Sequence, residues 1–117
     1  MSGFISKSRI ATRSHSWLPP VAKQALIQAK NDLRNNVQVP FEVFGNNFGG
    51  PGDGPPLPDV SQGCGYFEVQ VGHAHPGDAE PAGRHRLVLE INVSSRQILE
   101  IYYTEEHYAK GSFVRIL

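Results

Sequence analysis

The chain combines one helical stripe with segments that otherwise alternate as strands do, and this most restricts how it can fold. Apolar side chains between residues 22 and 33 recur at the three- and four-residue spacing of an amphipathic helix: Ala22, Ala25, Leu26, Ala29 and Leu33. Pro19 and Pro20 suit the first turn of such a helix, and Asn35 and Asn36 suit its end. We therefore expect one helix of about 15 residues that needs a sheet to cover.

Three later segments alternate apolar and polar side chains, and two shorter ones read as strands. The alternating segments are 66–71, 86–93 and 97–104, and the short strands are 41–44 and 112–117. Their apolar sides comprise Phe67, Val69, Val71, Leu87, Leu89, Ile91, Val93, Leu99, Ile101 and Tyr103. The opposite side of 86–93 comprises Arg86, Val88, Glu90 and Asn92. This order predicts an α+β fold, with an N-terminal helix packed on one face of a twisted antiparallel sheet and an open, polar opposite face that carries the active site.

The length of 117 residues predicts one domain. We expect residues 1–16, which are polar and basic, to form a flexible arm, and residues 17–117 to form the domain. Cys64 is the only cysteine, which excludes an internal disulfide, and the chain has no apolar run of transmembrane length and no visible signal peptide. The Gly- and Pro-rich segment 45–59 predicts a loop, which is either functional or a plain connector.

The net charge of zero hides an uneven distribution along the chain. Residues 1–36 carry six Lys or Arg and one Asp, residues 37–80 carry six acidic residues and no Lys or Arg, and residues 81–117 carry five bases and four acids. A neutral total argues against nucleic-acid binding through bulk charge alone. A neutral total is still compatible with a local site that binds one phosphate.

Glu68, Arg86 and His107 combine the three side-chain types that metal-free RNA cleavage needs. The alternation places Glu68 and Arg86 on the same side of neighbouring strands, and His107 follows the third strand. A carboxylate can take the proton of a ribose 2′-OH, an imidazolium can protonate the leaving oxygen, and a guanidinium can hold the phosphate. The alternative is an ordinary cross-strand ion pair beside a surface histidine.

Four segments resemble those of the barnase-like, guanyl-specific microbial ribonucleases. YYTEEHYAKGSF resembles their active-site histidine segment, and LPDVSQGCGYFEVQV resembles the strand with their catalytic glutamate. RHRLVLE resembles their arginine strand, and WLPPVAKQALIQA resembles their helix start. The resemblance covers residues 17–117, and the histidine motif is its specific part. It implies a metal-independent endoribonuclease that needs no cofactor and forms 2′,3′-cyclic phosphate products.

Carried over by position, the resemblance implies that Glu68 is the general base, Arg86 the phosphate-binding residue and His107 the general acid. It implies substrate contacts from Phe44, Asn46, Asn47 and Tyr108. The chain departs from the family in two places. Phe48 or a glycine stands where the family has a guanine-binding glutamate, so we expect a weaker purine or guanine preference. Ala82 stands where many members have a second arginine, a charge that Arg84, His73 or His75 could supply.

The expected partner is RNA, bound by a monomer that does not associate with membranes. Family members also occur as toxin domains delivered into competing bacterial cells, which would require an acidic, barstar-like immunity protein over the Arg86–His107 cleft. A secreted, scavenging ribonuclease is the alternative context. The rival from another class is a non-catalytic RNA- or protein-binding module that retains the fold.

Overall fold

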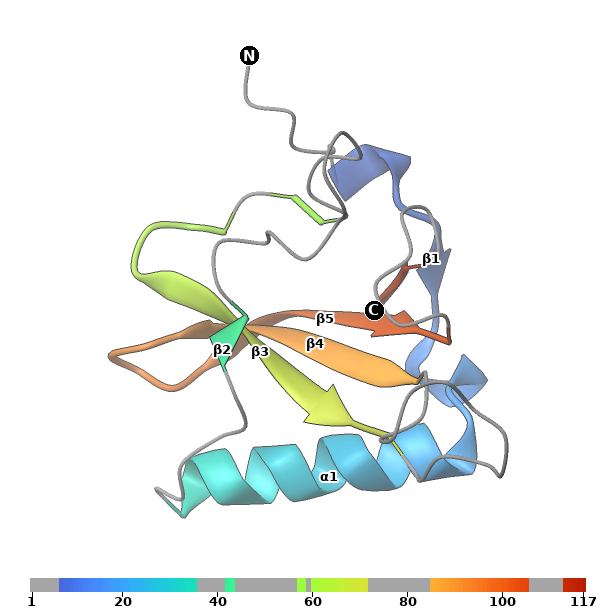
Figure 1. The fold of residues 1–117 in the computed structure, drawn as a ribbon, viewed down its shortest axis with the longest axis horizontal. Coiled ribbons are helices and arrows are strands. Elements are labelled where there is room, and N and C mark those ends of the chain that lie inside the picture. Colours follow the sequence, from blue (N-terminus) through green and yellow to red (C-terminus); the bar gives the residue numbers. More distant parts are fainter. Residues whose placement is uncertain (1–6, 36–41, 44–56, 59, 72–84, 106–112) are drawn as a thin grey trace.

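The computed structural model is an α+β fold, in which one long helix packs against a six-stranded sheet (Figure 1). It describes residues 7–35, 42–43, 57–58, 60–71, 85–105 and 113–117. The strands are β1 (Thr12–Arg13), β2 (Glu42–Val43), β3 (Cys64–Gln70), β4 (Arg86–Asn92), β5 (Ile98–Thr104) and β6 (Val114–Ile116). They lie in the order β1-β6-β5-β4-β3-β2, and every neighbouring pair is antiparallel except β1 and β6.

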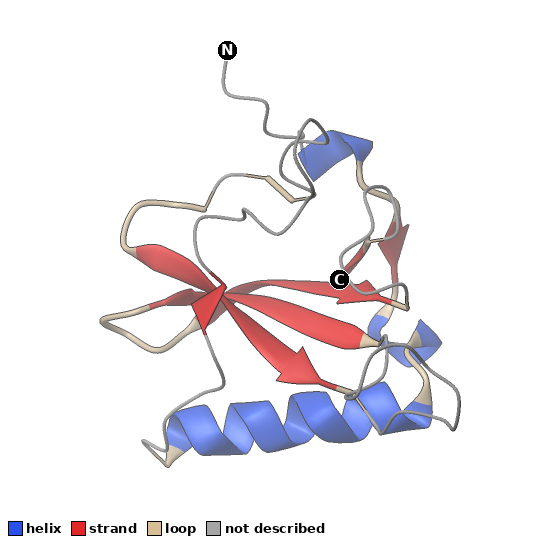
Figure 2. Ribbon diagram, in the orientation of Figure 1, coloured by secondary structure: helices blue, strands red, loops and turns tan. Residues whose placement is uncertain are grey.

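The helix α1 spans Pro20–Arg34 and confirms the predicted helix. Pro20 occupies its first turn, where the missing N–H leaves no bond unmade, and Asn35 ends it by donating its N–H to the Asn31 carbonyl. The buried residues are Ala22, Leu26, Ala29 and Leu33, as the apolar stripe predicts. Figure 2 shows α1 lying along one face of the sheet.

The core between α1 and the sheet contains most of the predicted apolar side chains. It is formed by Leu18, Ala22, Leu26, Ala29, Leu33, Val69, Val71, Leu87, Leu89, Ile91, Tyr103 and Ile116, with Phe67 and Ile101 packed against it. Two predictions are wrong. Val93 is 62% exposed because β4 ends at Asn92 and residues 93–95 form a turn. Leu99 is 44% exposed because the register shifts from Glu90↔Glu100 to Ile91↔Ile98, which leaves Leu99 as the extra residue of a β-bulge.

The face opposite α1 is not open and polar along its whole length, which corrects the sequence-based prediction. A second core covers part of it and consists of Ile10, Leu57, Tyr66, Val88, Tyr102 and Phe113, with Val60 packed against it. Val88, predicted to face outward, is fully buried there. The physical reason is that Ile10, Leu57 and Phe113, which come from distant parts of the sequence, pack on this face. As a result β4 is buried on both faces from Arg86 to Ile91.

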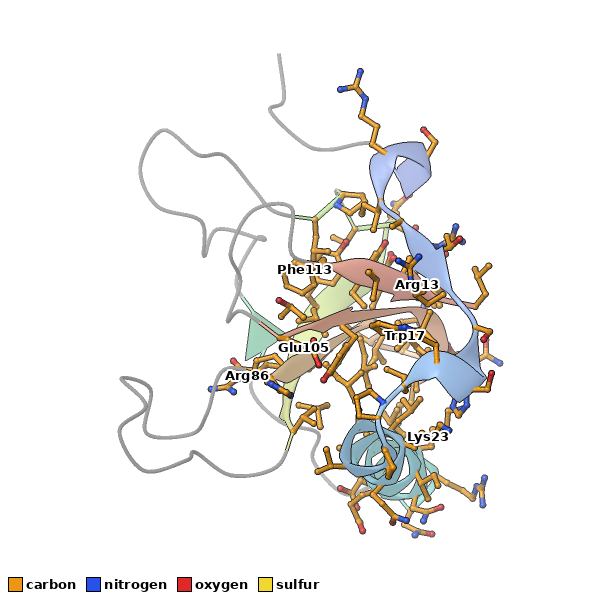
Figure 3. The ribbon with its side chains drawn as sticks, turned by 90° about the vertical axis from the view of Figure 1, so that its right-hand side faces the viewer. Arg13, Trp17, Lys23, Arg86, Glu105 and Phe113 are labelled. Carbon is orange, nitrogen blue, oxygen red and sulfur yellow. The ribbon has the colours of Figure 1, made fainter. Side chains whose placement is uncertain are left out.

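The N-terminal segment supplies part of this cover, within the stretch 1–16 for which the sequence predicts a flexible arm; residues 1–6 lie outside the described residues. Thr12 and Arg13 pair with Arg115 and Ile116 of β6, and Ile10 is buried in the second core. Two short 3₁₀ helices, Lys7–Arg9 and His15–Trp17, flank this strand. The Arg13 guanidinium lies 5.6 Å from the centre of the Trp17 ring (Figure 3). This pairing and the burial of Ile10 join residues 10–13 to the rest of the sheet.

Candidate active site

Glu68 and Arg86 meet on the sheet face opposite α1, as predicted. In the β3–β4 register Glu68 lies opposite Val88 and Gln70 lies opposite Arg86, which makes Glu68 and Arg86 diagonal neighbours on one face. The Arg86 Nε donates to the Glu68 Oε1 at 2.7 Å, within the short range of charge-assisted hydrogen bonds. The Arg86 Nη1 donates to the His85 carbonyl at 2.8 Å.

The two partners of this ion pair differ in their access to solvent. The Arg86 side chain is only 4% exposed, whereas the Glu68 side chain is 28% exposed. The contact uses Oε1, and no hydrogen bond of Oε2 to the described residues is seen. Arg86 is therefore a buried cation that holds the Glu68 carboxylate in a position that a solute can reach.

His85, Tyr103 and Glu105 form a hydrogen-bonded chain on the other face of the sheet, where Tyr103 packs in the core against α1. The Tyr103 hydroxyl donates to the Glu105 Oε2 at 3.2 Å and lies 3.0 Å from the His85 Nδ1. A phenol has one proton, so a Tyr103 hydroxyl that donates to Glu105 requires a protonated Nδ1 on His85. Burial, and then the charge and hydrogen bond of Glu105, raise the pKa of Tyr103 above its ordinary value, which keeps this hydroxyl neutral.

This chain was not predicted from the sequence, because its members come together through the strand register, which sequence spacing does not determine. Leu87 pairs directly with Tyr103, so His85, two residues earlier on the same side, is a diagonal neighbour of Tyr103. The sequence pattern points to Arg84, His73 and His75 as sources of an extra charge, and not to His85. Because the His85 carbonyl also accepts from Arg86, the chain fixes the first residues of β4.

The other predicted site residues lie outside the described residues. They are His107, the predicted acid, together with Phe44, Asn46, Asn47, His73, Arg84 and Tyr108. The structure thus brings together two of the three predicted catalytic residues, Glu68 and Arg86. Among the described residues no group of three or more His, Cys, Asp or Glu could hold a metal ion. No helix of the described part is long and apolar enough to cross a membrane.

Comparison of the chain with protein-family models, with curated proteins and with solved structures gave no match. The geometry of Glu68 and Arg86 therefore carries the functional argument, together with the resemblance of the sequence motifs.

Proposed function

We propose that the protein is a metal-independent endoribonuclease that cleaves single-stranded RNA. The observation that carries this proposal is the Glu68–Arg86 contact, in which a buried guanidinium holds a partly exposed carboxylate. A carboxylate with one oxygen fixed by a cation and the other directed elsewhere suits a general base, because its position is set without consuming both acceptors.

The proposed reaction has two steps that balance without any co-reactant except water. Glu68 takes the proton of the 2′-OH, the 2′-oxygen bonds to phosphorus, and the bond from phosphorus to the 5′-oxygen breaks as His107 protonates that oxygen. The product is a 2′,3′-cyclic phosphate. Water then attacks the phosphorus and loses a proton to His107, while the 2′-oxygen leaves and regains a proton from Glu68.

Arg86 has two roles in this proposal. It positions Glu68 in the free protein, and its charge lies beside the phosphorus, where negative charge accumulates in the transition state. The Phe48 departure makes us expect a purine preference that is weaker than strict guanine selectivity. A toxin that requires an acidic immunity protein, or a secreted scavenger, is the proposed context.

Digestion of total RNA in EDTA tests the proposal, because EDTA binds divalent metal ions and so inactivates any contaminating nuclease that depends on them. We expect cleavage that leaves 2′,3′-cyclic phosphate ends early and 3′-phosphate ends late. Products with 3′-hydroxyl ends would contradict the mechanism. Binding of RNA without cleavage would contradict it too and would support the non-catalytic module.

A further inference from the structure

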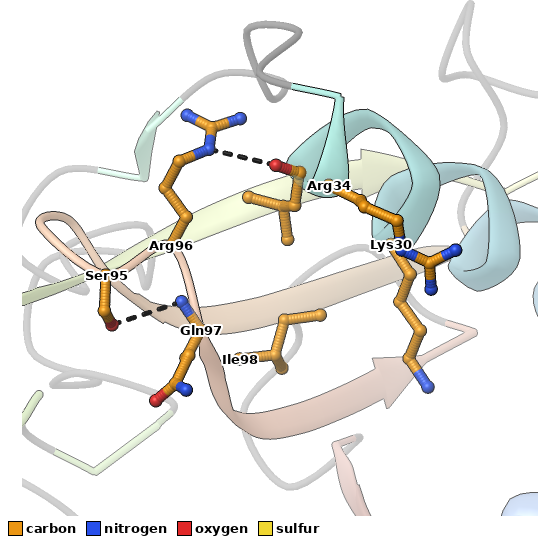
Figure 4. Close-up of a pocket in the computed structure, with 7 residues that line it drawn as sticks. Lys30, Arg34, Ser95, Arg96, Gln97 and Ile98 are labelled. Atoms are coloured by element: carbon orange, nitrogen blue, oxygen red, sulfur yellow. Dashed lines mark hydrogen bonds between the residues drawn. The ribbon is translucent and has the colours of Figure 1, made fainter.

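A cleft of about 660 Å³ lies between the C-terminal turn of α1 and the turn that joins β4 to β5 (Figure 4). Its lining residues are Lys30, Leu33, Arg34, Ser95, Arg96, Gln97 and Ile98. The volume falls within the roughly 300–1,000 Å³ of small-molecule sites. The cleft lies at the end of β4 opposite to Arg86, so it is separate from the candidate active site.

The lining of this cleft is cationic. Lys30, Arg34 and Arg96 contribute three positive charges, and none of the lining residues is acidic. Lys30 and Arg34 are exposed and lie four residues apart on one face of α1, where like charges repel by a few tenths of a kcal/mol (about 0.2–0.5). Within the described part of the chain, neither side chain has a hydrogen bond or ion pair. An anion in the cleft would relieve this repulsion.

Arg96 is held in place from both sides of the cleft. Its Nε donates to the Leu33 carbonyl at 3.1 Å, which ties the turn to the end of α1. Its backbone has φ 62°, a left-handed conformation that costs an L-residue other than glycine about 1 kcal/mol. The Asn92 Oδ1 accepts the N–H groups of Ser94 and Ser95 and thereby fixes the turn. The turn thus places a guanidinium where glycine would be the least strained residue.

We propose that this cleft binds a backbone phosphate of single-stranded RNA at a distance from the bond that is cleaved. The ammonium and guanidinium groups suit a phosphate, the Ser95 hydroxyl and Gln97 amide supply further donors, and Leu33 and Ile98 give an apolar surface for a ribose or base. The seven residues of β4 separate it from Arg86 by about 20 Å along the strand. The proposal rests on the proposed function and adds a contact that only RNA longer than a dinucleotide can reach.

The test measures binding of a fluorescent 2′-O-methyl oligonucleotide of about 12 nucleotides, within the ~4–16 that single-strand-binding surfaces occupy. The blocked 2′-oxygen prevents cleavage. For the Lys30→Gln/Arg34→Gln double variant we expect about 3- to 10-fold weaker binding. The slope of log K against log salt should fall by about 0.7, the value for one lost phosphate contact on a single strand. Lys23→Gln, on the first turns of α1 and outside the cleft, is the matched control and should bind as the wild type does.

Cleavage kinetics separate this proposal from the proposed function. We expect the double variant to raise KM for the long RNA and to leave dinucleoside phosphate cleavage unchanged. Unchanged oligonucleotide binding in the double variant would overturn the cleft proposal while cleavage still stood. If the wild type binds the oligonucleotide, the double variant binds it more weakly and neither cleaves RNA, the cleft proposal stands and the proposed nuclease function is contradicted. Inorganic phosphate is the second probe. If it shifts the Ser95 and Arg96 amide NMR signals but does not compete with the oligonucleotide, the cleft binds a free anion and not RNA, and the proposal is overturned.

Discussion

Two cross-strand ion pairs lie on the same face of the sheet, and they differ in which partner is accessible. In the Glu68–Arg86 pair the arginine is 4% exposed and donates through Nε to one carboxylate oxygen. In the Glu100–Arg115 pair the arginine donates to both oxygens, at 2.6 and 2.9 Å, and the carboxylate is the more covered partner. In the first pair one Glu68 oxygen makes no hydrogen bond to the described residues, whereas in the second pair the arginine bonds both oxygens of Glu100. A carboxylate–arginine pair therefore indicates a site only when its geometry leaves the carboxylate accessible.

The two pairs should differ in how much they stabilise the fold. Glu68→Ala removes the carboxylate from the buried Arg86 guanidinium, and Glu68 is itself partly exposed, so we expect the free energy of unfolding to fall by about 2–3 kcal/mol. Glu100→Ala leaves an arginine that water reaches more easily, and we expect a loss of about 1 kcal/mol. Urea denaturation of both variants measures this. Equal losses would show that the burial of Arg86 has no energetic consequence.

Exchange of arginine for lysine should separate the pairs in activity. Arg86→Lys keeps the charge but loses the planar fork, so we expect turnover of RNA to fall about 10- to 100-fold. Arg115→Lys is the matched control and should keep turnover within about twofold, since its partner lies outside the proposed site. Steady-state kinetics with a dinucleoside phosphate provides the test. An effect confined to KM would show that Arg86 docks RNA without stabilising the transition state.

The smallest effect concerns Tyr102, which lies in the second core between the two pairs. Burial, and then the charges of Glu100 and Glu90, raise the pKa of Tyr102 from 10.0 to about 12. The folded state therefore favours the neutral phenol, and its contribution to stability is complete below pH 10 and is lost as the pH rises towards 12. The Tyr102 hydroxyl has no hydrogen-bond partner among the described residues.

The free energy of unfolding of Tyr102→Phe at pH 7 should therefore lie within about 1 kcal/mol of the wild-type value. The variant should also lose less stability than the wild type as the pH rises from 10 to 12. Chemical denaturation at several pH values between 7 and 12 checks this. An unchanged pH dependence in the variant would assign the alkaline loss to other groups.

The fold was predictable where a residue's environment follows from local periodicity. The stripe from Ala22 to Leu33 has a single period, and the structure confirms the helix and its buried face. The same holds for Leu87, Leu89 and Ile91, which face α1. Alternation failed at Leu99, because a β-bulge is set by how two strands pair and leaves no mark in one strand alone.

The candidate site was predictable for the same reason, and only in part. Glu68 and Arg86 share a face through alternation and strand order, so their contact could be expected. The second core over Val88 and Tyr102 depends on Ile10, Leu57 and Phe113, which are distant in sequence and follow no common period. The Tyr103–His85 contact joins residues 18 positions apart, and its hydrogen bond depends on side-chain geometry that sequence spacing does not determine.

The most direct measurement compares RNA cleavage in EDTA by the wild type, Glu68→Gln and Glu100→Gln. Glutamine keeps an oxygen that can accept from Arg86 or Arg115, so both variants should fold, and thermal melting tests this. We expect Glu68→Gln to lose at least about 10²-fold in turnover, the usual effect of removing a general base. Glu100→Gln should cleave within about twofold of the wild type. Wild-type cleavage by Glu68→Gln, or an equal loss in both variants, would contradict the assignment of Glu68 as the base.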